Sequence, residues 1–378
     1  MGQSFEAARR ALLLLPRGLE GWELREAMAL VESANYRVVG TIWYRRVTRS
    51  RLLSRAKLEE VAKRAEELRG DEDARIIVYD ELRPREYFRI VKAARVETID
   101  RTLLILEIFA QHAGSREAKY QIELARLKHR LPLVREAVRL AKMRELPGFL
   151  GPGGYAVDKY YRYMVSRIAR IRRELERLRQ RRETERAKRR SAGLPHVAIV
   201  GYASAGKTSL FNLLTGLDKP TGEEYFTTIS PKVRAASIGG QRVAFVDTVG
   251  FISRIPPEII EAFHSTLEEA ATADVILYVL DASEPEDAIA EKLSEGLDTL
   301  RRLGVVGIPM LVALNKVDLV GPSDVVRLRD LVGAMVESVY PALRAVIPVS
   351  ARQGTGLDEL RCSIATLLSG TVGSTCFG

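Results

Sequence analysis

Short apolar segments alternate with helical stretches through the first 112 residues. Four segments have the pattern of short strands, at 11–16, 36–45, 75–80 and 96–100. Residues such as 19–34 and 57–70, which lie between them, have the pattern of helices. This alternation predicts a parallel sheet covered by helices, so we expect an N-terminal α/β domain over residues 1–112.

The pattern then becomes helical. Residues 101–146 contain few helix breakers other than Gly114 and Pro132, and a loop rich in glycine and proline follows them. Beyond this loop, residues 158–190 have the pattern of one long helix with a short apolar seam at heptad spacing. The seam consists of Met164, Ile168, Ile171, Leu175 and Leu178. We expect it to pack on the preceding helix and form a basic helical hairpin over residues 113–192.

Alternation of strands and helices resumes after a break at 191–195. Residues 196–369 contain six apolar segments, nearly all followed by a helical stretch, which predicts a doubly wound sheet. The six segments are 196–202, 233–238, 242–248, 274–282, 310–316 and 345–351. Ligands of such sheets bind at the carboxyl ends of the strands. Residues 370–378 are small and polar, and we expect a disordered tail there.

The composition is that of an ordinary soluble protein of two or three domains. The chain has 378 residues, of which 46% are hydrophobic, and its early apolar run at 11–16 is too short to span a bilayer. We therefore expect a cytoplasmic protein without membrane contact, and a monomer, because the sequence carries no clear oligomer signal. The two cysteines and four histidines are too few for a disulfide framework or a metal cluster.

Charge is divided unequally along the chain. Residues 1–190 carry 44 lysines and arginines against 27 acidic residues, whereas residues 191–378 carry 15 against 22. The first part therefore has a net charge of +17 and the second part −7. A strongly basic half is typical of a protein that binds a polyanion. Basic helices that are merely solvated are the alternative.

A phosphate-binding loop is predicted at residues 201–210, GYASAGKTSL. This segment follows a predicted strand and opens a helical stretch, which is the context that the P-loop motif requires. Gly201 and Gly206 would let the backbone approach the phosphates, Lys207 would bridge the β- and γ-phosphates, and Thr208 would bind Mg²⁺. The amides expected around the phosphates belong to Ser204, Ala205, Gly206, Lys207, Thr208 and Ser209.

Two later segments, NKVD at 315–318 and SAR at 350–352, predict recognition of guanine. A carboxylate only accepts hydrogen bonds, and guanine offers the donors N1–H and the 2-amino group to Asp318. Adenine would leave this carboxylate unpaired, which disfavours an ATPase or a small-molecule kinase. The other predicted contacts are Asn315 near N7, Lys316 over the base, the Ala351 amide at O6, Ser350 as a brace, and Arg352 beside them.

The γ-phosphate should be sensed by two loops. Residues 218–231 offer Thr227 and Thr228 as candidate ligands of Mg²⁺ and the γ-phosphate. In the segment DTVGFI, Asp247 would hold the metal through water and the Gly250 amide would contact the phosphate. Loss of the γ-phosphate would release both loops, so the domain is expected to act as a switch.

Hydrolysis needs a placed water, and the residue after D-x-x-G is often a glutamine that orients it. Phe251 occupies this position. We therefore expect slow intrinsic hydrolysis, with Lys207 neutralising charge and main-chain groups at Thr228 and Gly250 holding the water. Phe251 would point away from the phosphate, into an apolar lining or toward a partner. Arg254 is a further candidate for the catalytic site, although a solvated arginine is the simpler interpretation.

Together with the N-terminal half, these motifs resemble the HflX family of ribosome-associated GTPases. The resemblance covers residues 36–369 and is carried by 80–90, 99–132, 151–162 and the DTVGFI segment. It implies a translation-factor-class P-loop GTPase that binds GTP and GDP and uses Mg²⁺ as its cofactor. Its expected partner is the large ribosomal subunit with its RNA, in splitting or rescue of stalled ribosomes. The family's switch segment F-A-T-L-D-P corresponds to 226–231, which places the functional threonine at Thr228 and adds Phe226 to the nucleotide site.

Two departures from the family pattern concern the P-loop and the hairpin tip. Ser204 stands where the family commonly has asparagine, so the intrinsic rate of hydrolysis can differ. The family tip G-P-G-E-T-Q-L-E is replaced by GPGGYAVD at 151–158. If the tip reaches RNA, aromatic and basic side chains would provide stacking and phosphate contacts, and the alternative is that the tyrosines pack within the hairpin. The candidates are Tyr155, Lys159, Tyr160 and Arg162.

The sequence thus predicts a GTPase that binds the large ribosomal subunit through its basic N-terminal half. The alternative is a structural RNA-binding protein whose nucleotide site only stabilises the fold.

Overall fold

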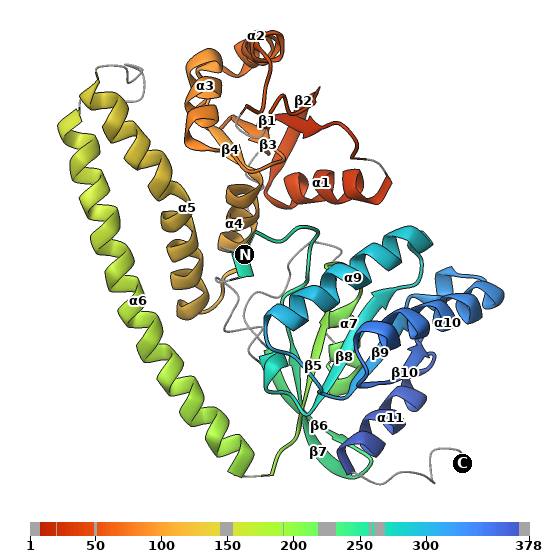
Figure 1. Ribbon diagram of the computed structural model, residues 1–378. Helices are drawn as coiled ribbons and strands as arrows, with labels where there is room; N and C mark the ends of the chain where they lie inside the picture. The colour runs from red at the N-terminus through yellow and green to blue at the C-terminus, as the bar shows by residue number, and fades with distance from the viewer. Residues whose placement is uncertain are drawn as a thin grey trace, which may run out of the picture. The chain divides into compact units, whose positions relative to one another are not determined.

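The computed structural model describes residues 8–19, 21–48, 51–143, 154–191, 193–217, 232–256, 259–260 and 269–369 (Figure 1). The chain divides into two compact units, which are described separately. The first contains Met1–Gln111, Lys119–Glu176 and Pro256–Ala262, and the second contains His112–Ala118, Arg177–Ile255 and Phe263–Gly378.

A four-stranded parallel sheet with the order β2-β1-β3-β4 forms the centre of the first unit. Its strands are β1 (Arg9–Pro16), β2 (Tyr36–Tyr44), β3 (Arg75–Val78) and β4 (Thr98–Asp100). Its helices are α1 (Gly21–Ser33), α2 (Arg55–Arg64) with the 3-10 turn η1 (Ala65–Leu68), α3 (Pro84–Ala94) and α4 (Arg101–His112). Both faces of such a sheet are buried, which is why Leu12 and Leu13 of β1 are both inaccessible.

Local chemistry sets the starts of two of these helices. The Ser54 hydroxyl accepts a hydrogen bond from the Lys57 amide at the beginning of α2, as an N-cap does. Pro84 occupies the first turn of α3, where its missing amide donor costs nothing. The buried Asp100 carboxylate accepts from the Leu103 amide at the start of α4 (3.0 Å) and contacts His129 of the hairpin at 2.6 Å.

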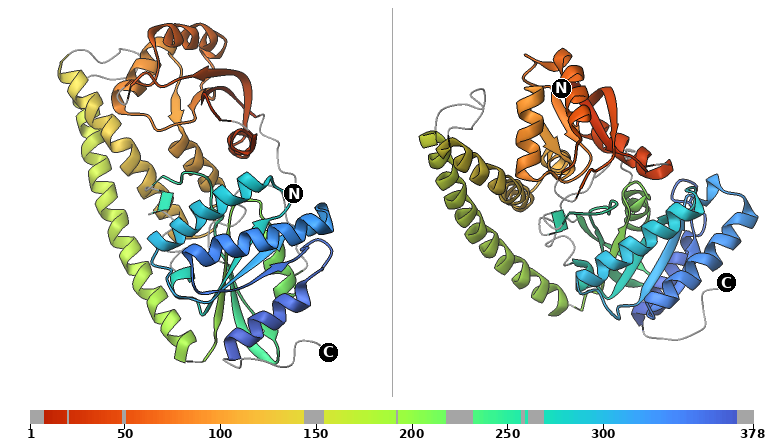
Figure 2. Two further views of the ribbon diagram at one scale, coloured as in Figure 1. Left: turned by 45° about the vertical axis from the view of Figure 1, so that its right-hand side comes forward. Right: turned by 45° about the horizontal axis from the view of Figure 1, so that its top comes forward.

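The predicted helical hairpin consists of α5 (Arg116–Lys142) and α6 (Gly154–Ser191). The two helices run side by side in all three views (Figures 1 and 2). Ile168 and Ile171 of the seam pack with Leu124 of α5, and Arg167 donates two hydrogen bonds to Glu123 at 2.6 and 2.8 Å. The expectation that the seam packs on the preceding helix is therefore confirmed. Pro132, expected to be a breaker, lies inside α5.

A six-stranded sheet with the order β10-β9-β8-β5-β7-β6 forms the centre of the second unit. Its strands are β5 (His196–Gly201), β6 (Lys232–Ile238), β7 (Gln241–Asp247), β8 (Val275–Asp281), β9 (Met310–Asn315) and β10 (Leu343–Pro348). All neighbours are parallel except β6 and β7, which pair antiparallel at one edge. Because β5 lies between β7 and β8, the strand order reverses beside it, and ligands of open α/β sheets bind at such a point.

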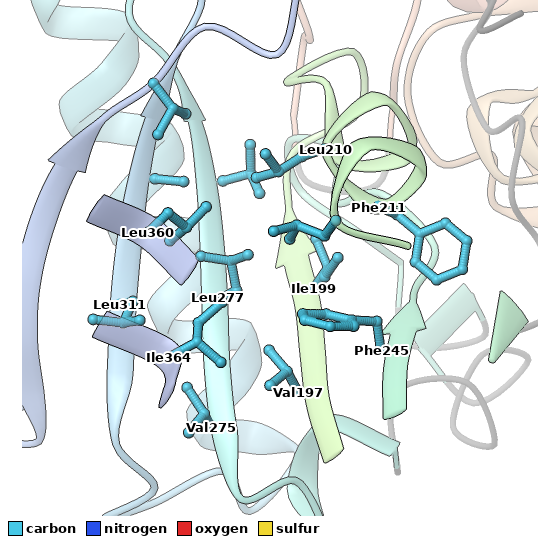
Figure 3. Packing of buried hydrophobic residues seen from close by; sticks show 14 of the residues in the cluster. Val197, Ile199, Leu210, Phe211, Phe245, Val275, Leu277, Leu311, Leu360 and Ile364 are labelled. Atoms are coloured by element: carbon cyan, nitrogen blue, oxygen red, sulfur yellow. The ribbon is translucent and has the colours of Figure 1, made fainter. Parts of the chain in front are cut away.

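Helices cover both faces of this sheet. They are α7 (Lys207–Thr215), α9 (Glu286–Arg302), α10 (Pro322–Val339) and α11 (Leu357–Ser369), with the 3-10 turn η3 (Val317–Leu319). Residues of α7 and α11 pack with Ile199 and Leu277 in one core (Figure 3). The next residue of β8, Tyr278, points to the opposite face and contacts α9. The α/β domain, the hairpin and the doubly wound domain confirm the predicted fold class.

Three expectations about the whole chain concern membrane contact, the tail and the domain boundaries. Among the described residues, none of the helices has the length and apolar character needed to span a membrane. Residues 370–378, predicted to be a disordered tail, lie outside the described residues, and so does Cys376. The division into domains at 1–112, 113–192 and 196–369 stays a prediction.

Candidate nucleotide-binding site

The predicted P-loop connects the end of β5 to the start of α7. Gly201 has a φ of 142°, and a Cβ there would lie 2.2 Å from the Val279 carbonyl oxygen of β8. Gly206 has a φ of 92°, and a Cβ would lie 2.2 Å from Asn315 Nδ2. Only glycine fits either position. The exposed Ser204 has a φ of 60°, in the left-handed region. A loop in which right-handed and left-handed residues alternate directs successive amides toward one point, as anion-binding loops do.

Lys207 begins α7 and is 7% exposed. Its ammonium donates a hydrogen bond to the Tyr202 carbonyl oxygen at 2.5 Å, across the loop. Burial lowers the pKa of Lys207 to about 8, and the Asp247 carboxylate opposes this shift. A buried cation held over a loop of converging amides provides a site for the phosphates of a nucleotide.

The Thr208 hydroxyl donates a hydrogen bond to Asp247 Oδ2 at 3.0 Å. Asp247 is fully buried at the end of β7, next to the P-loop. A hydroxyl and a carboxylate side by side are the oxygen ligands that Mg²⁺ takes, so these residues fit the predicted metal site. The third predicted ligand, Thr228, and also Phe226, lie outside the described residues.

Asn315, the last residue of β9, joins the phosphate loop to the base loops. Its Nδ2 donates to the Ala205 carbonyl oxygen at 2.8 Å, and its Oδ1 accepts from the Ala351 amide at 2.9 Å. The sequence predicted Asn315 near the purine N7 and the Ala351 amide at O6. The structure pairs these two groups with each other and with the P-loop, and so joins the two loops. Their contacts with the purine stay a prediction.

Asp318 is held by the loop that follows β10. The Ser350 hydroxyl donates to Asp318 Oδ1 at 2.6 Å, which is the bracing position that the sequence predicted for it. Lys316, with a φ of 66°, pairs with Asp281 at 2.5 Å, so the structure adds a partner that the sequence analysis did not identify. Arg352 is exposed on the same loop. That the Asp318 carboxylate accepts from guanine N1–H and the 2-amino group stays a prediction.

Phe251 is 1% exposed and lies between Tyr202 and Tyr278, with 6.4 Å between its ring centroid and each of theirs. This is the apolar lining that the sequence analysis expected for an apolar residue after D-x-x-G. Gly250 lies beside Ala203 and the Lys207 ammonium. No sequence pattern indicates Tyr202, Lys292 or Glu295 of α9, because their contacts join positions that are distant in the chain.

The described candidates for RNA contact lie on α6. Tyr160 is 47% exposed and its ring stacks on that of Tyr163, which is 58% exposed, at 6.3 Å between centroids. Both rings therefore face outward rather than into the hairpin. Arg162 is exposed and pairs with Asp158 at 3.0 Å, and Lys159 is exposed beside it. Tyr163 was missed by the sequence analysis, and the Tyr155 side chain lies outside the described part of the chain.

Replacing Ser350 with alanine tests the guanine site. The variant removes a hydrogen bond to a carboxylate, so GTP and GDP should both bind about tenfold more weakly, with their ratio unchanged. Equilibrium binding with fluorescent nucleotides measures this. Ser338→Ala is the matched control, because Ser338 Oγ bonds only its own helix at Met335. Unchanged affinity in Ser350→Ala would remove Asp318 from the base site.

The lowered pKa of Lys207 predicts a pH dependence of nucleotide binding. Phosphates favour the charged ammonium, so the pKa of Lys207 should rise on binding. At about pH 8.5, above the free-state pKa of about 8, binding should therefore take up a proton, and affinity should fall as the pH rises further. Calorimetry of GDP binding in two buffers of different ionisation enthalpy detects the uptake. A heat independent of the buffer at that pH would contradict the assignment.

Comparison with known proteins covers almost the whole chain. Family profiles described as GTP-binding GTPase N-terminal, GTP-binding GTPase Middle Region and 50S ribosome-binding GTPase match residues 22–110, 112–189 and 196–316. The GTPase HflX of Hyperthermus butylicus is 70% identical over 97% of this chain and 98% of that protein. The GTPase HflX of Saccharolobus solfataricus is 39% identical over 90% of this chain and 95% of that protein.

A crystal structure of a GTP-binding protein from the hyperthermophilic archaeon Sulfolobus solfataricus, in complex with GDP, is also similar. It is 35% identical, has a TM-score of 0.53, and the match covers 96% of this chain and 99% of that chain. The site described above contains a phosphate loop with a buried lysine, and Asp318 lies where the sequence predicted recognition of guanine. The chain therefore belongs to the HflX family of GTP-binding GTPases and is a GTP hydrolase.

Proposed function

We propose that this GTPase binds the large ribosomal subunit through its basic N-terminal half, and that GTP hydrolysis limits how long it stays bound. The observation that carries the proposal is the division of charge, +17 over residues 1–190 and −7 over residues 191–378. Ribosomal RNA is the polyanion to which the first half is suited, because phosphates dominate the affinity of basic proteins for nucleic acid. The description of the family profile over residues 196–316, 50S ribosome-binding GTPase, supports this partner.

The hairpin provides the surface for RNA. Within residues 157–184 of α6, eight basic residues are exposed against two acidic ones. The basic residues are Lys159, Arg162, Arg170, Arg172, Arg173, Arg177, Arg179 and Arg181. The stacked rings of Tyr160 and Tyr163 face solvent on the same helix. Exposed aromatic rings beside arginines suit unpaired bases and phosphates together, so we assign RNA contact to this helix and to Tyr155 at its start.

Hydrolysis on the free protein should be slow. Phe251 is buried and provides no polar group at the position where other GTPases orient water, so the main chain at Gly250 and Thr228 would hold it. Lys207 and the P-loop amides would neutralise charge on the phosphates. Thr208 and Asp247, with Thr228, would hold Mg²⁺, which when bound supplies further charge neutralisation at the β- and γ-oxygens. A group from the ribosome would complete the site.

This division of labour suits a factor that acts in the cytoplasm on stalled or recycling ribosomes. GTP would favour the bound state, and hydrolysis would release the protein after it has helped to split or rescue the ribosome. Membership of a GTPase family sets aside the alternative of a non-hydrolysing structural protein. Asp318 with its Ser350 brace argues against an ATPase, because adenine would leave the carboxylate unpaired.

Single-turnover GTP cleavage titrated with purified large subunits tests the proposal. We expect slow cleavage alone and at least about tenfold faster cleavage with subunits, because a group supplied in trans can add several orders of magnitude. The stimulation should be lost between about 50 mM and about 200 mM salt, since phosphate contacts are screened over that range.

Lys207→Ala is the control for this experiment, and it should bind nucleotide poorly in both conditions. Cleavage that subunits leave unchanged at low salt would contradict the proposed partner. Stimulation that persists at high salt would instead contradict the electrostatic basis of the proposal.

A further inference from the structure

The D-x-x-G loop is joined to the P-loop by main-chain hydrogen bonds. The Phe251 amide donates to the Gly201 carbonyl oxygen at 3.0 Å, and the Ala203 amide donates to the Phe251 carbonyl oxygen at 2.7 Å. Gly250, the residue before Phe251, lies very close to the P-loop. A Cβ added at Gly250 would lie 2.8 Å from Ala203 Cα and 2.9 Å from Lys207 Nζ. We call this arrangement the docked loop.

Aromatic packing holds the docked loop from its other side. The Phe251 ring meets the Tyr202 ring edge to face, with an interplanar angle of 76°. The Tyr278 ring also contacts the Phe251 ring, and the two ring planes make an angle of 40°. Because Tyr202 belongs to the P-loop and Phe251 to the D-x-x-G loop, their contact adds side-chain packing to the main-chain bonds between the same two loops.

Glu295 of α9 contacts both loops with one oxygen. The Tyr202 hydroxyl donates a hydrogen bond to Glu295 Oε2, and the Arg254 amide donates to the same oxygen at 3.4 Å. Arg254 has a φ of 44°, in the left-handed region that a non-glycine residue enters at a cost. Such a conformation persists only where surrounding groups hold it, and the Glu295 carboxylate is one such group at the Arg254 amide.

The position of Glu295 is fixed by the rest of α9. Lys292, one turn earlier, pairs with both oxygens of Glu284 at 2.5 Å and lies 5.5 Å from the centre of the Tyr202 ring. At Gly296 a Cβ would lie 1.9 Å from the Tyr278 hydroxyl, so only glycine lets the helix approach the sheet this closely. Because α9 is packed in this way, it holds Glu295 in a fixed position beside the two loops.

The docked loop has a different consequence for GTP than for GDP. The γ-phosphate binds to the P-loop lysine and to the glycine amide of D-x-x-G, which are here Lys207 and Gly250. These are the two groups that the docked loop brings together, so a γ-phosphate has to separate them, whereas GDP does not. A ligand shifts an equilibrium only through its different affinity for the two states.

We propose that the bridge of Tyr202, Glu295 and Arg254 stabilises the docked loop and thereby sets the preference of this GTPase between GTP and GDP. Tyr202 and Glu295 are positioning residues, because they act on the γ-phosphate through Gly250 and not by contact with the nucleotide. The proposal concerns the isolated protein and does not depend on ribosome binding.

Tyr202→Phe, Glu295→Gln and the double variant test the proposal. The measured quantity is the ratio of the Kd for a non-hydrolysable GTP analogue to the Kd for GDP, each from equilibrium titration of the full chain with Mg²⁺. Tyr202→Phe removes the hydrogen bond and Glu295→Gln removes its charge, so each single variant should lower this ratio by about three- to tenfold. The double variant should lower the ratio by less than the product of the two single effects, because both changes act on the contact between Tyr202 and residue 295.

Matched controls separate the bridge from general effects. Asp298→Asn changes an exposed aspartate one turn later on α9, and Tyr340→Phe removes a hydroxyl that bonds Ile308 away from the site. Both controls should leave the ratio unchanged. An unchanged or raised ratio in the test variants, or equal weakening of both nucleotides, would overturn the proposal. If Tyr202→Phe fails to fold, Glu295→Gln alone decides the question, since glutamine keeps the shape of glutamate.

Discussion

Two hydrogen bonds of one side chain hold the nucleotide site together. Asn315 Nδ2 bonds the P-loop at Ala205, and Asn315 Oδ1 bonds the base loop at Ala351. Because Asn315 ends a central parallel strand, these bonds fix the phosphate loop and the guanine loop at the same edge of the sheet. The side chain is 2% exposed, so loss of either bond would leave a buried polar group unsatisfied. Recognition of the base and of the phosphates therefore depends on the same core residue.

The switch region is built on a second constraint, the burial of Phe251. An apolar ring held between Tyr202 and Tyr278 cannot orient water, but it anchors the D-x-x-G loop against the P-loop. The position after D-x-x-G, which in other GTPases carries a glutamine that orients water, is here occupied by Phe251, and Phe251 fixes the position of Gly250. This exchange would explain how the slow intrinsic hydrolysis and the response to ribosomal subunits that we propose can belong to one site. Helix α9 adds to the anchor through Glu295, so the nucleotide state is coupled to a packed helix as well as to a loop.

Much of this account could be predicted from the sequence, because local pattern determines it. The P-loop glycines, the seam on α6 and the end-of-strand positions of Asp247 and Asn315 follow from spacing alone. The contacts of Tyr202 and Lys316 could not be predicted, since Glu295 and Asp281 are distant in sequence and only the fold brings them near. The antiparallel edge pair of β6 and β7 was missed for the same reason, because strand order is a property of the assembled sheet.

We propose that the γ-phosphate, acting through the D-x-x-G loop, controls binding to the large ribosomal subunit. The most direct measurement is the affinity of the full chain for purified large subunits at low salt, with a non-hydrolysable GTP analogue and separately with GDP. We expect tighter binding with the analogue, because only a γ-phosphate acts on both Lys207 and Gly250. Equal affinity in the two nucleotide states would contradict it.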